Sequence, residues 1–138
     1  METINYRYIF NYRGIDEQTF PILQLRVLNP VDLQQGMDAD GYLDSGCQAS
    51  LFDGSIARII GLDLLAGERK FYGTLTGPQI EARLHTIRLS HPDLGDFDLR
   101  IGFSLTQIPR NLLGRDFFNL TQVGFRERRL TFYMNRTP

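Results

Sequence analysis

The sequence predicts an all-β domain, closed into a barrel or a sandwich-like sheet, with one or two short helices. Three observations favour this class: short apolar runs recur along the chain, polar turns with glycine or proline separate them, and no alternation of strand and helix repeats. A chain of 138 residues has room for one hydrophobic core. We therefore expect a single domain over residues 1–138, in which 1–19 form an N-terminal extension with a first strand.

Strands are expected where apolar residues alternate with polar ones. The aromatic opening around residues 6–10, the run 20–28 and the run 97–103 fit this pattern, and the last is the clearest. Asn29-Pro30 ends the second run, and the polar stretch 34–40 is expected to be a loop. Apolar residues at 123–125 and 130–132 predict a terminal hairpin around a turn at 126–129.

A second hairpin is expected between residues 71 and 89, with a glycine-bearing turn at 73–78. Ile80, Ala82 and Leu84 share one parity, whereas Ile87 and Leu89 have the other. A one-residue shift exchanges the faces of a strand, so we expect a bulge or bend near residues 85–86.

Two segments have helical features. Asp53 is a capping residue, Ile56, Ile59 and Ile60 follow at helical spacing, and Gly61 ends the run. The aromatic segment 115–120 is expected to form a second brief helix packed on the core.

Composition narrows the function classes. The formal net charge is −1 and the isoelectric point is near 6.1, so the arginines at 126–129 predict a solvated turn better than a nucleic-acid site. No apolar run is long enough to span a membrane, and the N-terminus lacks the features of a secretory signal. The single cysteine excludes an internal disulfide, so we expect a reducing, cytoplasmic setting.

The most informative motif is Asp44-Ser45-Gly46, which follows the apolar residues Tyr42-Leu43. An aspartate held at the end of such a run is a candidate catalytic carboxylate. A second landmark, Leu112-Leu113-Gly114-Arg115, lies far downstream, and the glycine-bearing hairpin stands between the two.

These segments, in this order, resemble the landmarks of retropepsin-type aspartic proteases. That family has two hydrophobic residues before Asp-Ser/Thr-Gly-Ala, a glycine-tipped flap, and a hydrophobic-hydrophobic-Gly-Arg-Asn/Asp segment that opens a helix. The similarity runs from about Phe20 to Phe132. It implies a retropepsin-like barrel with a flap hairpin and an aspartic endopeptidase that needs no cofactor or metal.

The resemblance assigns a role to each landmark. Ser45 and Gly46 are expected to support the loop of Asp44, with Ser45 hydrogen-bonding across a dimer axis. Leu112, Leu113 and Gly114 are expected to pass through that loop, with the leucines screening the carboxylate. Arg115 is expected to form an ion pair beneath the loop or across the dimer, and Asp116 to cap the helix or pair structurally.

The substrate-binding residues are expected in two places. Those of the hairpin close over an extended peptide, and those after Gly46 line the cleft: Cys47, Gln48, Tyr72, Gly73, Leu75, Thr76 and Gly77. Cys47 replaces the usual alanine, and we interpret it as a small buried filler in preference to a functional thiol. Gln48 replaces the acidic residue of retroviral enzymes and is similar to that of the DNA-damage-inducible retropepsins, so retroviral substrate preferences are not expected.

The mechanism of this family requires two carboxylates that share one proton. The sequence contains no second Asp-Ser/Thr-Gly, so the resemblance implies a homodimer with one Asp44 from each subunit. Other readings stay open: a catalytically silent peptide-binding or dimerisation module of the same fold, and a nucleic-acid binder. His85, His91 and Cys47 lack metal-ligand spacing, and a Cys47–histidine protease has no support beyond the presence of its residues.

Overall fold

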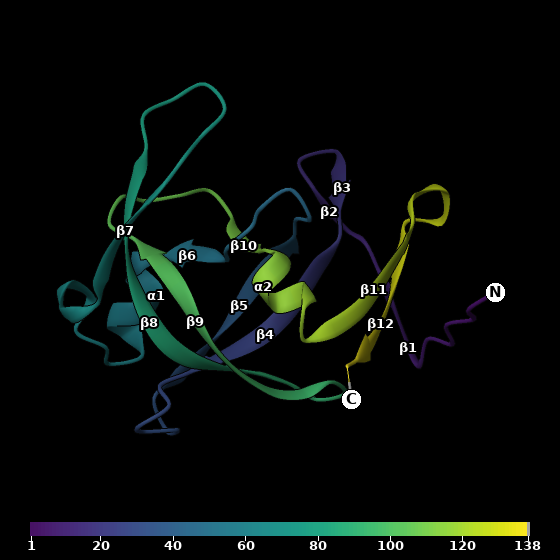
Figure 1. Ribbon diagram of the computed structural model, residues 1–138, viewed down its shortest axis with the longest axis horizontal. Helices are drawn as coiled ribbons and strands as arrows, with labels where there is room; N and C mark the ends of the chain where they lie inside the picture. The colour runs from purple at the N-terminus through teal and green to yellow at the C-terminus, as the bar shows by residue number, and fades with distance from the viewer. Residues whose placement is uncertain (138) are drawn as a thin grey trace.

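The structure of the protein is a computed structural model that describes residues 1–137 (Figure 1). Its twelve strands are β1 (Tyr8–Asn11), β2 (Arg13–Ile15), β3 (Gln18–Phe20), β4 (Ile22–Leu28), β5 (Gly36–Leu43), β6 (Leu51–Asp53), β7 (Glu68–Tyr72), β8 (Ile80–His91), β9 (Gly95–Ser104), β10 (Asn111–Leu113), β11 (Thr121–Arg126) and β12 (Thr131–Arg136). The helical elements are α1 (Gly54–Ile59), η1 (Leu64–Ala66), α2 (Arg115–Phe118) and η2 (Glu127–Arg129). No helix in this part of the chain has the length and hydropathy needed to cross a membrane.

The main sheet has seven strands in the order β4-β5-β10-β6-β9-β8-β7. An additional pairing of β4 with β8 closes six of them into a barrel, and β7 extends beyond it. Closure removes two sheet edges that would otherwise expose unpaired backbone groups. The predicted closed all-β barrel is confirmed.

Strand β10 lies between β5 and β6, parallel to β5 and antiparallel to β6. The chain that joins β5 to β6 must therefore pass around β10, although β10 comes some sixty residues later in the sequence. This crossing brings the two landmark motifs together.

The barrel encloses an aliphatic and aromatic core. Phe52, Phe97, Phe103 and Phe117 are fully buried, and the Phe97 and Phe117 rings meet edge to face with centroids 5.1 Å apart. Phe117 comes from α2, so the short aromatic helix is held by its packing, as the sequence predicts. The other predicted helix is also present, with the Asp53 side chain accepting from the Ser55 N–H at its start.

Outside the barrel, β1, β12 and β11 form a three-stranded antiparallel sheet, and β2 and β3 form a small hairpin. The terminal hairpin is confirmed, with η2 as its turn. The N-terminal extension is more structured than expected, because it holds β1, β2 and most of β3.

One expectation is wrong, and of the bulge or bend expected in β8 only a curvature of the strand is present. Residues 36–40, expected in a loop, belong to β5, where Met37 and Ala39 face inward and Asp38 and Asp40 face outward. No bulge interrupts β8, which keeps one-to-one register with β9 from Ala82 to His91. The strand instead curves across the barrel (Figure 1), pairing with β7 in its first half and β4 in its second, so the two halves bury opposite faces.

Candidate active site

Asp44 opens the loop that joins β5 to β6, residues 44–50, here called the active-site loop. Its backbone N–H donates to the Leu113 carbonyl at 3.0 Å, which continues the ladder between β5 and β10 by one step. The Asp44 side chain is half-buried, and its Oδ1 accepts from the Gly46 N–H at 2.9 Å. Cys47 closes the turn by donating its N–H to the Asp44 carbonyl. Local hydrogen bonds thus fix one oxygen of the carboxylate.

A cluster of hydrogen bonds among Ser50, Gly114 and Asp116, here called the buried lock, joins the underside of the loop to α2. Ser50, which is fully buried, donates its Oγ–H to Asp116 Oδ1 at 2.6 Å and its N–H to Asp116 Oδ2 at 3.0 Å. The Ser50 Oγ in turn accepts from the Gly114 N–H at 2.9 Å. Phe117 adds a third donor to Asp116. Asp116 therefore has a structural role at the helix start, as expected, and both of its oxygens are occupied.

The first turn of α2 also donates to the active-site loop. The Arg115 N–H reaches the Cys47 carbonyl at 2.8 Å, and the Asp116 N–H reaches that of Gln48 at 3.3 Å. The guanidinium of Arg115 is exposed and forms no ion pair with residues 1–137. The ion pair expected beneath the loop is thus not formed within residues 1–137, and the alternative pairing across a dimer stays a prediction.

Leu112, Leu113 and Gly114 pass beside the loop as expected, but the two leucines differ in role. Leu113 is fully buried against Gly41 and belongs to the core. Leu112 pairs with Tyr42, and both lie on the opposite face of the sheet. By the alternation of side chains Asp44 shares that face, so of the two leucines only Leu112 is placed to shield its carboxylate. Gly114 is needed for close approach, because a Cβ there would lie 2.5 Å from the Cys47 carbonyl oxygen.

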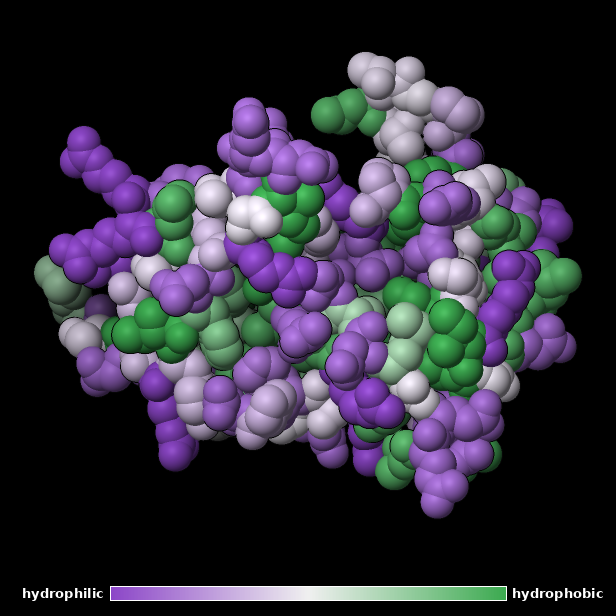
Figure 2. All heavy atoms as spheres, turned by 180° about the vertical axis from the view of Figure 1, so that it is seen from behind, coloured by the Kyte–Doolittle hydropathy of each residue, from purple (hydrophilic) through white to green (hydrophobic). Residues whose placement is uncertain are grey.

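The expected flap is the β7–β8 hairpin, whose loop spans residues 73–79. Thr74 Oγ1 accepts from the Gly77 N–H at 2.9 Å, and Gly73, Leu75, Thr76 and Gly77 are all exposed. The loop extends from the barrel on the side where β5 ends (Figure 1), and in the view from behind it stands clear of the remaining surface (Figure 2).

Tyr72 lies at the base of this hairpin and not at its tip. Its hydroxyl donates to the Ser50 carbonyl at 2.9 Å, and its ring packs against Gly102, where any side chain would collide with it. Burial, followed by the negative charge of Asp116, raises the pKa of Tyr72 to about 12. Tyr72 therefore anchors the hairpin to the active-site loop and stays neutral at physiological pH.

A cavity of about 560 Å³ separates the active-site loop from the hairpin base. Five predicted site residues meet in its lining, and sequence reasoning missed the other three: Gly46, Cys47, Gln48, Tyr72 and Gly73, with Ala49, Lys70 and Phe71. The Lys70 ammonium lies 5.0 Å from the centre of the Tyr72 ring. Leu75, Thr76 and Gly77 lie outside this lining, on the exposed loop.

Cys47 is half-buried and lines the cavity, so it is more exposed than the small buried filler that the sequence favoured. Its thiol donates to the Ala49 carbonyl at 3.0 Å. Burial, and then the charge of Asp44, raises the pKa of Cys47, which keeps the thiol protonated and weakly nucleophilic. Within residues 1–137, no three histidine, cysteine or acidic side chains gather as metal ligands.

A cluster that the sequence analysis missed lies beside Tyr42. The Arg110 guanidinium carbon is 4.2 Å from the centre of the Phe20 ring and 5.1 Å from that of Tyr42. The available signal was an arginine directly before the Asn111-Leu112-Leu113 strand. It becomes informative only once β10 is known to lie next to β5.

Two solved structures show the same architecture. A retropepsin-like aspartic protease from Rickettsia conorii has a TM-score of 0.62 at 16% identity, over 96% of this chain and 97% of that one. EIAV protease in complex with the inhibitor HBY-793 has a TM-score of 0.55 at 15% identity, over 78% of this chain and 92% of that one. The chain has the retropepsin fold. No protein-family model and no curated protein matches it.

The retropepsin fold accounts for the position of the site within the barrel. Strands β5 and β10 are parallel neighbours, and Asp44 directly follows β5 as Gly114 directly follows β10. At these identities the likeness to solved structures concerns the fold, so the functional argument rests on the residues of the site.

Proposed function

We propose that the protein is an aspartic endopeptidase that acts as a homodimer, with Asp44 of each subunit forming one catalytic pair. The observation that carries this proposal is the state of the Asp44 carboxylate. One oxygen accepts from Gly46, whereas the other has no hydrogen-bond partner among residues 1–137 and the side chain is only half-buried. A carboxylate held in place on one side and open on the other suits a group that binds water or a second carboxyl.

The chemistry follows from placing two such carboxyls side by side. Two like charges about 3 Å apart do not both ionise, so the pair retains one proton between them. The ionised member takes a proton from a bound water as the water oxygen attacks the peptide carbonyl, whose oxygen the protonated member polarises. The C–N bond then breaks as the leaving amine nitrogen takes up a proton from the pair, which leaves one proton shared between the two carboxyls. The pair titrates as a unit, which predicts activity over a limited, acidic pH range.

The need for a second subunit follows from the single chain. Asp116 hydrogen-bonds to Ser50 of the active-site loop, but three donors already occupy its carboxylate, so it is not available as the second catalytic group. Ser45 is exposed beside Asp44, and its hydroxyl makes no hydrogen bond within the described residues. We assign to it the contact across the dimer axis. The end of β5, which Asp44 directly follows, and the β7–β8 loop lie on the same side of the molecule (Figure 1), where a second copy can meet both.

The substrate class follows from the shape of the site. An extended polypeptide fits between the active-site loop and the β7–β8 hairpin, with its backbone hydrogen-bonded and its side chains alternating between pockets. The 560 Å³ cavity provides one such pocket, with both apolar and polar groups in its lining. Leu75, Thr76 and Gly77 would close over the bound peptide, with Gly73 and Gly77 allowing the movement.

Cleavage of a peptide library by the purified dimer tests this function. Dimerisation is verified first by sedimentation, and cleavage is then followed from acidic to neutral pH. We expect the native chain to cut peptides with apolar residues near the scissile bond, and Asp44→Asn to abolish cutting while leaving the dimer intact. A verified dimer that cuts nothing in this range would instead favour a catalytically silent peptide-binding or dimerisation module.

A further inference from the structure

We propose that Arg110, stacked on Phe20 and Tyr42, forms a subsite that selects an acidic side chain of the substrate close to the scissile bond. This inference rests on the proposed function, because it concerns the peptide bound at Asp44. The Phe20 and Tyr42 rings are themselves 5.4 Å apart at 60°, so the guanidinium lies over two packed aromatic rings. Such stacking holds the flat cation in a defined orientation and leaves the N–H donors at its edges free.

The register of the sheet places this cluster on the catalytic face. Leu43 and Leu113 are buried in the core and pair with one another across β5 and β10. Successive side chains of a strand alternate between faces, so Tyr42 and Leu112 point away from the core. Asp44 has the same parity as Tyr42 and lies two residues, about 7 Å, further along. The aromatic platform of Arg110 is therefore a neighbour of the catalytic carboxylate.

The segment that carries Arg110 is held at both sides by hydrogen bonds. Before it, the Ile108 N–H donates to Asp53 Oδ1 at 3.0 Å. After it, Asn111 accepts from the Asp53 N–H at 2.8 Å and donates to the Asp40 carbonyl at 3.2 Å. The position of Arg110 is thus set by the barrel and not by a free loop.

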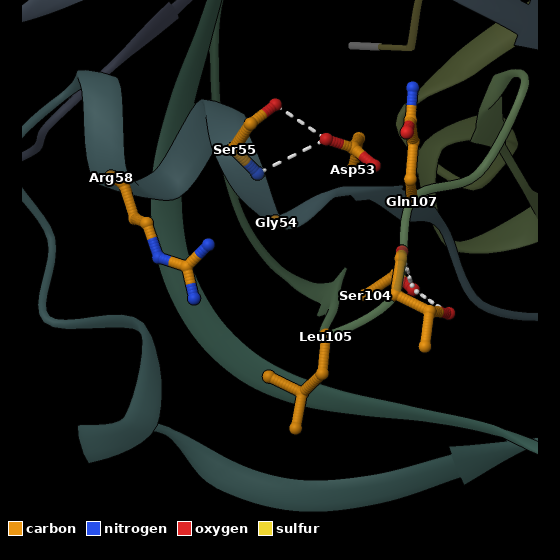
Figure 3. Close-up of a pocket in the computed structure, with 8 residues that line it drawn as sticks. Asp53, Gly54, Ser55, Arg58, Ser104, Leu105 and Gln107 are labelled. Carbon is orange, nitrogen blue, oxygen red and sulfur yellow. Dashed lines mark hydrogen bonds between the residues drawn. The ribbon is translucent and has the colours of Figure 1, made fainter.

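Asp53 itself lies at the start of α1, next to a cavity of about 250 Å³ that Figure 3 shows. Its Oδ2 accepts from the N–H and the hydroxyl of Ser55, drawn as dashed lines there. Although burial opposes ionisation, these bonds and that from Ile108 keep the pKa of Asp53 below its ordinary value. The carboxylate therefore remains a charged anchor for the Arg110 segment in mildly acidic solution.

Arg110 has no anionic partner among the described residues. It forms no ion pair with residues 1–137, and it is exposed. Asp40, on the same face of β5, is already paired with Arg13. An oriented, unpaired guanidinium is complementary to a carboxylate, which it can bind with two parallel hydrogen bonds. The chemistry on this face thus selects aspartate or glutamate over neutral residues.

The position of the acidic residue follows from the dimensions of an extended peptide. The Tyr42 side chain is about 7 Å from Asp44 along β5, and a bound peptide advances about 3.3 Å per residue. The selected side chain is therefore expected within about three residues of the scissile bond. A single substitution in the peptide can locate it.

Binding of matched peptides tests the subsite separately from catalysis. Peptide pairs carry either Glu or Gln at one position near the apolar cleavage point, and both ends are capped so that the side chain is the only carboxylate. Affinity is measured by fluorescence anisotropy on the Asp44→Asn dimer at about pH 6, where glutamate is ionised. We expect one Glu peptide to bind about fivefold more tightly than its Gln partner.

Three further variants identify the group responsible, each in the Asp44→Asn background. Arg110→Gln should abolish the preference for Glu, and Arg110→Lys should retain only part of it because lysine cannot bind in a planar, bidentate manner. Arg26→Gln is the matched control: Arg26 is exposed on β4, where it pairs with Asp38 toward the other end of β5. This control should keep the full preference.

The possible outcomes test the Arg110 subsite and the endopeptidase activity independently. Equal affinity for all Glu and Gln pairs, or a preference that survives Arg110→Gln, overturns the subsite, and cleavage by the native chain would still support the endopeptidase. A preference for Glu that depends on Arg110, without cleavage by the native chain, supports the subsite on a binding module and refutes the enzyme. A dimer that binds none of the peptides overturns the subsite as well.

Discussion

Replacement of Asp116 by alanine is expected to destabilise the protein strongly, although Asp116 is not catalytic. Its carboxylate accepts from the Ser50 hydroxyl, the Ser50 N–H and the Phe117 N–H. Hydrogen bonds to a charged acceptor each contribute about 1.5–3 kcal/mol, and Ser50 is fully buried, so its donors would lose a partner that water cannot easily replace. Because Asp116 is itself half-buried, we expect a total loss of about 3 kcal/mol, with Tm lowered by about 10 °C.

The assay is urea denaturation at a fixed chain concentration, since dimerisation makes apparent stability depend on concentration. Asp63→Ala is the matched control, because Asp63 is exposed and its side chain makes no capping bond; it should change stability by no more than about 0.5 kcal/mol. Ser50→Ala and the double variant complete a cycle, with an expected coupling of at least about 1 kcal/mol. If Asp116→Ala behaved like Asp63→Ala, or if the two changes were additive, the buried lock would be refuted.

Three further predictions concern separate parts of the site and the barrel. Gly114→Ala should lower the free energy of unfolding by about 1–3 kcal/mol in chemical denaturation, because its Cβ would lie 2.5 Å from the Cys47 carbonyl oxygen. Gly73→Ala is the control and should lower it much less, because its Cβ would have no neighbour within 4 Å. Equal losses would contradict the close approach at Gly114. Tyr72→Phe should cost about 1 kcal/mol by losing its bond to the active-site loop, and an unchanged midpoint would refute the anchor. Burial lowers the pKa of His91, so protonation favours the unfolded chain and stability should fall as pH drops below about 6.5. In the native chain His91 Nδ1 accepts from the Asp93 and Leu94 N–H groups, and His91→Asn keeps an acceptor for them. This variant should therefore lose stability less steeply in acid than the native chain. The same slope of stability against pH in both proteins would contradict the role of His91.

The sequence was most informative where a residue type is required by a motif or a cap. Asp44, Gly46 and Gly114 were identified from their place in two landmarks, and the structure brings them together at the ends of adjacent strands. Asp53 and Gly61 defined the first helix, and Gly61 has a φ of 82°, the left-handed conformation that glycine adopts after a helix. These features depend on local chemistry, which one sequence displays.

Elements that depend on tertiary pairing were missed. Asp38 and Asp40 made β5 look like a loop, but one face of an antiparallel pair can be solvated, and both aspartates form ion pairs there. The β2–β3 hairpin was missed because Asp16 and Glu17 hold its turn with φ of 50° and 67°, where glycine or asparagine is the usual signal. The strand register that groups Arg110 with Tyr42 has no local signature at all.

The most direct test of the central claim is the activity of mixed dimers. Native chains are mixed in equal amounts with Asp44→Asn chains, allowed to exchange, and assayed with a cleavable peptide at constant total concentration. If each site needs an Asp44 from both subunits, about one quarter of the native activity should remain, because only dimers of two native chains are active. Retention of about one half would show that each chain acts alone and would contradict the shared catalytic pair.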